Sequence, residues 1–223
     1  KEQVDDIMKL LEGAQYRVAE VKRGERLKKP PQPFTTSTLQ QEASKALNFS
    51  TQKTMRLAQQ LYEGVDIKGE GTVGLITYLR TDSTRVSEEA QRMAEDYIRA
   101  HYGEEYAAET GAEKKSSQKI QDAHEAIRPT DLNRMPTALK EELPRDLFRL
   151  YQLIWKRFLA SRMSVAKYET TSVKIQAEDL RNKNQVFTLS ASKLKFEGYM
   201  SVYIPEEDKE EENTLTGGLD QDS

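Results

Sequence analysis

The sequence has no cysteine among its 223 residues. This absence excludes disulfide bonds, thiol nucleophiles and cysteine-bound zinc within the segment. Long apolar runs are missing too, since no stretch approaches the ~20 uninterrupted apolar residues that span a bilayer. The two histidines, His101 and His124, are far apart in the sequence and offer no clustered metal ligands. We therefore expect no metal site in this segment, and no nicking enzyme built on paired metal-binding histidines.

An excess of positive charge is also lacking. Lys and Arg total 34 against 37 acidic residues, for a net charge of −3, which argues weakly against a dedicated nucleic-acid binder. A groove needs only a handful of cations, so the local distribution of charge can override that balance. The first residues, KEQVDD, contain no apolar signal-peptide core and no initiator Met. We expect a piece of a longer, cytoplasmic protein.

The spacing of apolar residues changes near residue 13. Residues 1–12 carry apolar side chains at helical spacing, and an alternating pattern then predicts a strand over 15–29. The strand ends in a charged run at 22–29, which could touch a nucleic-acid backbone but is at least as typical of an exposed strand end. The sequence PPQP at 30–33 cannot donate ladder hydrogen bonds, so it is interpreted as a stiff connector and a domain boundary.

Four helices are predicted between residues 36 and 162. Hydroxyl residues at Thr36, Ser50 and Ser87 mark three helix starts. The fourth helix begins near Pro144 and has one buried stripe. The residues of that stripe are Leu147, Tyr151, Ile154 and Phe158.

After Met163 the apolar residues alternate again. The pattern predicts three strands, around 173–177, 187–191 and 200–204. Residues 206–212 are nearly all charged and are expected to be solvated or disordered. A β-rich part, a helical insertion and a return to β structure together indicate an α+β fold.

One stretch is a candidate for covalent chemistry. Residues 71–83 read GTVGLITYLRTDS, so an apolar run leads to Tyr78 and, two positions later, Arg80. If the chain is extended there, both side chains point the same way. A tyrosine hydroxyl can act as a covalent nucleophile, and a nearby guanidinium favours the phenolate and holds a phosphate. On spacing alone, a tyrosine that ends a buried strand and an arginine in a surface pair are more common. The glycines at 69–71 are interpreted as a turn.

A second candidate cluster lies at 121–130, which reads QDAHEAIRPT. His124 beside Glu125 could donate to a phosphate oxygen or shuttle a proton near neutral pH. Arg128 is a second candidate phosphate contact. A lone histidine is more often a structural hydrogen-bond partner, and that alternative stays open here. His101 lies at a predicted helix end, where the helix dipole explains it.

Three strings of residues together resemble the bacterial DNA topoisomerase I family, a type IA topoisomerase family. They are PFTTSTLQQEA at 33–43, GLITYLRTDS at 74–83 and AHEAIRPT at 123–130, and they occur in the family's order. Later strings at 150–155 and 194–199 fit as well. The resemblance therefore covers nearly the whole chain.

The resemblance implies roles for individual residues. Tyr78 matches the nucleophile that attacks a phosphodiester of single-stranded DNA, forming a 5′-phosphotyrosyl link and releasing a 3′-hydroxyl. Arg80 matches the arginine that contacts the scissile phosphate, and His124 matches a histidine that touches the phosphate or assists proton movement. Residues of the same motifs are carried over as supports of the DNA-binding site. They are Thr77, Thr81, Asp82 and Ser83, beside the candidate contact Arg128.

The resemblance also implies a domain organisation. A helical domain with the active-site tyrosine, residues 36–162, is expected to be inserted into an antiparallel β arch formed by 1–35 and 163–223. The connector at 30–33 and the region around Met163 would act as hinges on which the helical domain swings to let a second strand pass.

The implied partners are single-stranded DNA and the remaining domains of the same parent chain, without a membrane, in a bacterial cytoplasmic monomer. No cofactor is expected in this segment, whereas Mg²⁺ is expected in the full-length parent, whose acidic metal-binding domain lies outside the chain. Religation needs no ATP, because the covalent link keeps the free energy of the broken bond. The segment alone is expected to be unable to relax negative supercoils. The alternative is a non-catalytic DNA-binding or interaction module that shares the scaffold.

Overall fold

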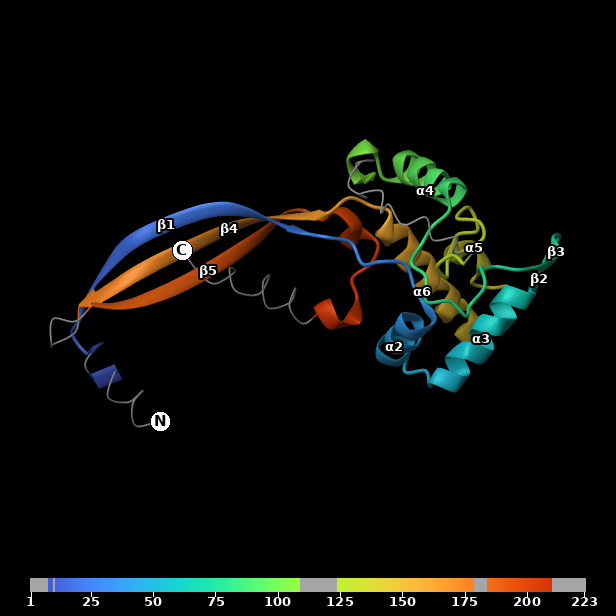
Figure 1. The fold of residues 1–223 in the computed structure, drawn as a ribbon, viewed down its shortest axis with the longest axis horizontal. Coiled ribbons are helices and arrows are strands. Elements are labelled where there is room, and N and C mark those ends of the chain that lie inside the picture. Colours follow the sequence, from blue (N-terminus) through green and yellow to red (C-terminus); the bar gives the residue numbers. More distant parts are fainter. Residues whose placement is uncertain (1–7, 10, 109–123, 179–183, 210–223) are drawn as a thin grey trace. The chain divides into compact units, whose positions relative to one another are not determined.

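The computed structural model describes residues 8–9, 11–108, 124–178 and 184–209, and Figure 1 shows the order of its elements along the chain. The chain divides into two compact units. We call the first the strand unit; its described residues lie before residue 29 and within Lys167–Phe196. We call the second the helical unit; it contains the described residues of Lys29–Ala166 and those from 197 onward. The helical unit thus includes residues 29–35, 163–166 and 197–209, which the sequence interpretation assigned to the arch; the insertion of one domain into an arch stays a prediction.

The strand unit is a three-stranded sheet in the order β1-β4-β5. Its strands are β1 (Gln15–Lys28), β4 (Ala166–Glu178) and β5 (Asn184–Phe196). β4 and β5 pair antiparallel, so that Val173 lies opposite Leu189 and Ile175 opposite Phe187. The alternation of apolar residues therefore predicted these strands correctly, and with the helices below it confirms the α+β fold. Of the helix expected over residues 1–12, residues 1–7 and 10 lie outside the described residues.

The helical unit contains five labelled α-helices (Figure 1), besides a short helical segment at residues 206–209. They are α2 (Thr36–Leu47), α3 (Thr51–Glu63), α4 (Glu88–His101), α5 (Pro136–Leu139) and α6 (Arg145–Ser161). Ser50 and Ser87 cap α3 and α4 as predicted, each accepting a hydrogen bond from a backbone N–H in the first turn. For α2 the cap is Thr35, one residue before the predicted start, and its reciprocal partner is Thr38.

α6 forms the centre of the core of the helical unit and contacts α2, α3 and α5. Its predicted stripe of four residues is buried, together with Trp155. The polar ends of two of its aromatic side chains are satisfied within the core: the Tyr151 hydroxyl donates to the Arg134 carbonyl, and the Trp155 indole donates to Leu132. No helix in the described part of the chain is long and apolar enough to cross a membrane.

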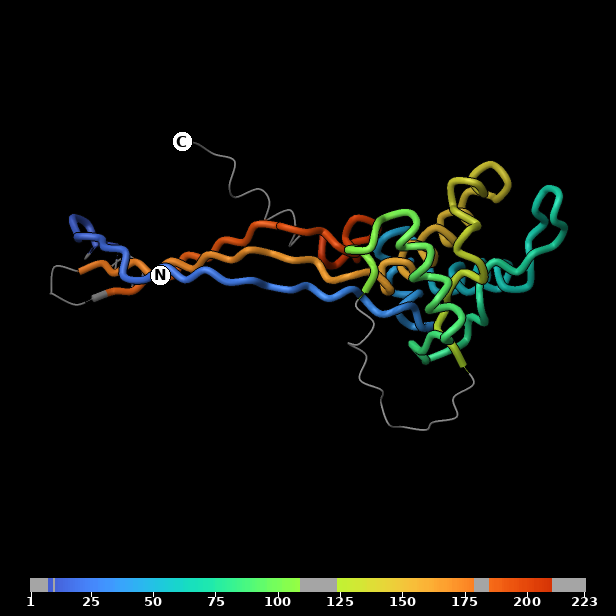
Figure 2. Tube along the Cα trace, turned by 90° about the horizontal axis from the view of Figure 1, so that it is seen from above, coloured from blue at the N-terminus to red at the C-terminus, as the bar shows by residue number. Residues whose placement is uncertain are grey.

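A short hairpin links α3 to the candidate nucleophile segment. Its strands are β2 (Val65–Ile67) and β3 (Gly71–Val73), and the turn between them confirms the interpretation of the glycines at 69–71. Figures 1 and 2 show the hairpin extending beyond the end of α3. After β3 the chain returns to α3, where the Leu75 N–H donates to the Leu61 carbonyl at 2.8 Å. The residues before Tyr78 are therefore fixed against a helix end.

The strand predicted around 200–204 is wrong. Gly198–Ser201 form a short 3-10 helix, η2, that begins at a glycine with φ of +50°. Burial follows Tyr199 and Tyr203, four positions apart, rather than the alternating apolar residues. An alternating pattern of three residues cannot distinguish a strand from a turn that places every fourth side chain inside.

The charged tail was expected to be solvated or disordered. Its described part, residues 206–209, is helical with largely exposed side chains, so the first alternative holds there. The backbone N–H of Glu206 donates to the buried carboxylate of Glu42, and Glu207 pairs with Lys45. Contacts with α2 thus hold this segment, while residues 210–212 lie outside the described residues.

Gly198 allows a direct test of how η2 packs against the backbone at Val165. A Cβ at this position would lie 2.5 Å from the Val165 carbonyl oxygen, in addition to the strain of the positive φ. We predict that Gly198→Ala lowers the free energy of unfolding by about 3 kcal/mol. Gly69→Ala is the matched control, because Gly69 also has a positive φ but no atom within 4 Å of the added carbon. It should cost about 1 kcal/mol. Urea unfolding measures both, and equal losses would contradict the packing argument.

Candidate functional site

Three segments that are distant in sequence meet beside α2 and α3. Phe34 bridges Ile127, and Ile76 bridges Pro129. The Ile127 N–H donates to the Phe34 carbonyl at 2.8 Å, and the Thr77 N–H donates to the Arg128 carbonyl at 2.9 Å. The two sequence clusters at 74–83 and 123–130 are therefore neighbours in the fold.

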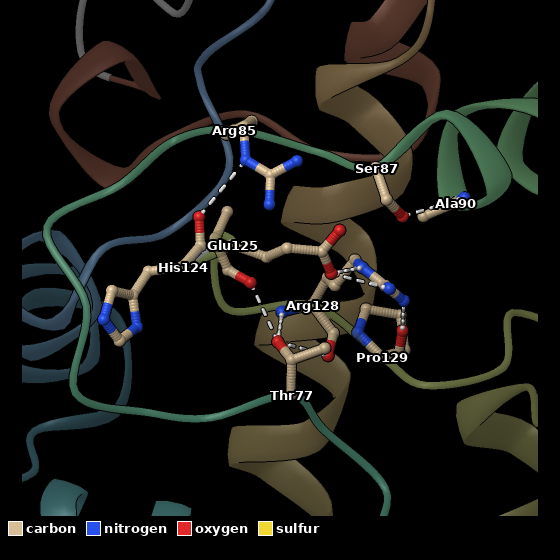
Figure 3. Close-up of polar contacts among 9 residues, drawn as sticks. Thr77, Arg85, Ser87, Ala90, His124, Glu125, Arg128 and Pro129 are labelled. Carbon is tan, nitrogen blue, oxygen red and sulfur yellow. Dashed lines mark hydrogen bonds and ion pairs between the residues drawn. The ribbon is translucent and has the colours of Figure 1, made fainter. Parts of the chain in front are cut away.

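Thr77 ties these two clusters together through its side chain. Its hydroxyl donates to the Ala126 carbonyl at 2.8 Å and accepts a hydrogen bond from the Arg128 N–H at 3.0 Å (Figure 3). Both the donor and one acceptor position of the hydroxyl are thus used by backbone groups. The geometry gives Thr77 a role in holding the backbone, and its expected contact with DNA stays a prediction.

Tyr78 and Arg80 project from the surface on either side of a buried anchor. Leu79 is 0% exposed, whereas Tyr78 is 44% exposed and Arg80 is exposed too. The segment is not a regular strand, because β3 ends at Val73. The alternation of exposed and buried side chains is nevertheless that of an extended chain. Both polar side chains can therefore reach a ligand at the surface.

The ring of Tyr78 packs against the ring of Tyr62 at the end of α3. The ring centroids are 5.4 Å apart and the planes are inclined by 66°, an edge-to-face arrangement. Both rings are partly exposed, so a planar aromatic ligand has room to contact them. No pattern in the sequence pointed to Tyr62, because its relation to Tyr78 depends on the β2–β3 hairpin between them.

A pocket of about 190 Å³ lies at this surface, lined by Thr77, Tyr78, His124 and Glu125. The structure thus brings together two of the three candidate catalytic residues, Tyr78 and His124, while Arg80 is not among the lining residues. His124 has an exposed side chain, and its carbonyl accepts a hydrogen bond from the Arg85 guanidinium at 3.4 Å. Arg85 is exposed as well. It follows the cluster at 71–83 in the sequence, and nothing in that position indicated that it would lie beside His124.

The loop after Arg80 is held by its own hydroxyl groups. The Ser83 N–H donates to the Thr81 hydroxyl at 3.1 Å, and the Arg85 N–H donates to the Ser83 hydroxyl at 3.2 Å. Thr81 is buried, whereas Asp82 is exposed. The hydroxyls of Thr81 and Ser83 are therefore used in local turns. Contacts of Thr81, Asp82 and Ser83 with DNA stay predictions.

Arg128 is committed to an internal ion pair. Two of its guanidinium nitrogens donate to one carboxylate oxygen of Glu125, at 2.8 and 3.1 Å, and the third donates to the Pro129 carbonyl at 3.1 Å (Figure 3). Its side chain is only 13% exposed. This geometry does not favour the expected contact with a DNA phosphate, which stays untested. The residue instead fixes the segment after His124.

Burial alone would raise the pKa of the Glu125 carboxyl. Hydrogen bonds from Ser87 and Arg128, together with the charge of Arg128, outweigh burial and lower the pKa below its ordinary value. Ser87 is also the cap of α4, so the carboxylate joins the start of α4 to the segment that carries His124. The His124 loop is therefore fixed by a charge as well as by backbone hydrogen bonds.

The remaining histidine has a structural position, as predicted. His101 lies in the last turn of α4, stacks on Tyr97 and makes a 2.9 Å hydrogen bond with the Tyr97 carbonyl. Among the described residues, no group of three or more histidine and carboxylate side chains could hold a metal ion. These residues by themselves therefore do not fit a Mg²⁺ site.

The chain is similar to known proteins in both sequence and structure. A family model described as DNA topoisomerase matches residues 1–222. The structure of full-length topoisomerase I from Thermotoga maritima is similar to this chain, with 41% sequence identity and a TM-score of 0.74. The match covers 90% of this chain and 31% of that protein.

The lowered pKa of Glu125 leads to a pH-dependent prediction. The charge of a carboxylate with a lowered pKa stabilises the folded chain at neutral pH, and this contribution is lost as the pH falls below the ordinary value of 4.5. We predict that Glu125→Gln costs about 1–2 kcal/mol at pH 7 and that the difference from the wild type shrinks between pH 5 and pH 3. Thermal unfolding at each pH measures it, with Glu141→Gln, at an exposed carboxylate, as the control. A difference that does not depend on pH would contradict the prediction.

Proposed function

This chain belongs to the DNA topoisomerase family, and we propose that it is the nucleophile-bearing part of a type IA enzyme. Such an enzyme cuts one strand of DNA, passes a second strand through the break and reseals it. The observation that carries the proposal is the half-exposed Tyr78 at a pocket shared with His124. Because the chain spans 31% of its relative, the activity, substrate and partners of the whole protein are proposals.

The proposed cleavage step is a transfer of a DNA phosphoryl group to Tyr78. The phenolic oxygen gives up its proton and forms a bond to phosphorus, while the bond from phosphorus to the 3′-oxygen breaks. The 3′-oxygen leaves with the electron pair and takes a proton, which yields a 5′-phosphotyrosyl link and a free 3′-hydroxyl. Resealing reverses these steps, and the phosphodiester re-forms without ATP because no bond energy has been lost.

The neighbouring residues have different roles in this proposal. Arg80, exposed next to the buried anchor Leu79, stabilises the negative charge on the phosphate. His124 lies in the pocket with Tyr78, where an imidazole can donate to a phosphate oxygen or carry the transferred proton. Arg85 is a further exposed cation beside His124. Thr77, Glu125 and Arg128 hold these groups in place through their internal hydrogen bonds, and contacts of Thr77 and Arg128 with DNA remain part of the proposal.

Single-stranded DNA suits the site better than a duplex. The two partly exposed rings of Tyr62 and Tyr78 offer an aromatic surface for an unstacked base. In the proposed enzyme, a monomer, this chain and the remaining domains of the same parent would hold the DNA strand together. Those other domains would also bind Mg²⁺. Strand passage requires the helical unit to move relative to the rest of the enzyme, with 30–33 and the region around Met163 as the proposed hinges.

Loss of the nucleophile is the first test of the proposed function. Tyr78→Phe in the full-length parent keeps the ring and its packing against Tyr62 but removes the attacking oxygen. We expect covalent adducts with a labelled single-stranded oligonucleotide to disappear, and the Kd for non-covalent binding to change by less than about threefold. Tyr62→Phe removes the hydroxyl of the neighbouring tyrosine and should still form adducts. Adducts that persist in Tyr78→Phe would assign the nucleophile elsewhere and favour a non-catalytic module here.

The second test concerns the chain by itself. We predict that the purified chain, with Mg²⁺, does not relax a negatively supercoiled plasmid, because the described residues form no acidic metal cluster and the rest of the DNA cleft is proposed to lie in other domains. The full-length parent in the same buffer is the control. Relaxation by the chain alone would show that the catalytic machinery is complete within it.

A further inference from the structure

Thr36, at the first position of α2, has contacts that its place in the sequence did not indicate. The sequence pattern pointed to Thr36 as a helix start, yet the helix cap is Thr35. The side chain of Thr36 instead turns toward the segment that follows Tyr78. It is half-buried and makes all its described contacts with backbone groups of that segment.

The hydroxyl of Thr36 bridges the two residues that flank Arg80. It donates to the Leu79 carbonyl at 2.7 Å, with the Thr81 carbonyl at 3.1 Å as a second acceptor. It also accepts a hydrogen bond from the Thr81 N–H at 2.9 Å. The Thr36 backbone N–H has no partner within its own helix, because it lies in the first turn. It donates to the Thr81 carbonyl at 2.9 Å. Four contacts from one residue thus hold the backbone on both sides of Arg80.

We propose that Thr36 is a positioning residue for Arg80 in DNA cleavage. The inference rests on the proposed function, in which Arg80 stabilises the charge on the scissile phosphate. Arg80 has a long, exposed side chain, so the location of its backbone decides which part of the surface its guanidinium can reach. Leu79 fixes that backbone from inside the core, and Thr36 fixes it from the end of α2.

The hydroxyl of Thr36 is used within the protein and does not act on DNA directly. It has one hydrogen to donate, which goes to a carbonyl of the loop, and it accepts from the Thr81 N–H. Removal of the hydroxyl leaves the Leu79 carbonyl and the Thr81 N–H to find other partners, and the loop shifts to reach them. A shift of about 1 Å in a group that binds the reacting phosphate can reduce the rate by about 100-fold.

Substitutions at Thr36 can separate its hydroxyl from its shape. Thr36→Val keeps the branched side chain and the backbone N–H but removes the hydroxyl, while Thr36→Ser keeps the hydroxyl. In the full-length parent we expect Thr36→Val to lower the single-turnover rate of adduct formation by about 10- to 100-fold. Its Kd for the oligonucleotide, measured in the Tyr78→Phe background, should change by less than about threefold. Thr36→Ser should restore the rate to within about threefold of the wild type.

A double-mutant cycle tests whether Thr36 acts through Arg80. In an Arg80→Ala background the guanidinium is absent, so Thr36→Val should slow adduct formation by less than about threefold further. A reduction as large as in the wild-type background would overturn the proposal, because the hydroxyl would then act independently of Arg80. If Thr36→Val fails to fold by thermal unfolding, the Thr36→Ala and Thr36→Ser pair supplies the same comparison. Equal rates in the two members of that pair would also overturn it.

The outcomes for Tyr78 and Thr36 are distinguishable. If Tyr78→Phe still forms adducts, the proposed function fails together with the inference. If Tyr78→Phe abolishes adducts while Thr36→Val forms them at the wild-type rate, only the inference about Thr36 is wrong. If Thr36→Val weakens DNA binding and cleavage by the same factor, Thr36 affects DNA binding rather than the position of Arg80, and the inference is again wrong.

Discussion

The candidate site depends on hydrogen bonds among segments that belong to no regular sheet. Residues 34–36, 75–81 and 126–130 have few ladder partners. Many of their backbone groups bond to one another or to the hydroxyls of Thr36 and Thr77, and others bond to Leu61 and Arg85. Unpaired backbone groups are costly when buried, which leaves these segments few alternative arrangements. Satisfaction of the backbone therefore fixes the surface from which Tyr78 and His124 project.

The cations near the site are of two kinds, bonded and exposed. Arg128 bonds to Glu125 and Pro129 and contributes to the fold, whereas Arg80, two residues after Tyr78, and Arg85, at the His124 carbonyl, are exposed. A net charge of −3 is therefore compatible with the DNA binding proposed for this chain. The relevant quantity is the charge presented at one surface, and acidic residues elsewhere reduce it little because salt screens them beyond about 10 Å.

Elements specified by neighbouring residues could be predicted from the sequence, whereas those that depend on distant residues could not. Caps at Ser50 and Ser87 and the stripe of α6 are local patterns, and the structure confirms them. The expected strand near residue 202 is wrong because a left-handed glycine, which alternation does not reveal, turns the chain. In the site, Tyr78 and His124 could be paired from the sequence only through resemblance to a family. The partners of Thr36, Thr77 and Arg128 depend on contacts between distant segments, which no local pattern encodes.

α2 connects the site to the segment that follows η2 in the helical unit. Its first residue holds the loop of Arg80, and nearly two turns further along the helix Glu42 accepts hydrogen bonds from the Tyr203 hydroxyl and the Glu206 N–H. Burial, and then the hydrogen bond to Glu42, raise the pKa of the Tyr203 hydroxyl above its ordinary value. Arg157 of α6 donates to both Tyr203 and the Gln32 carbonyl in the proline-rich connector. Hydrogen bonds from α2 and α6 therefore hold the proline-rich connector and the segment after η2 against the core of the helical unit.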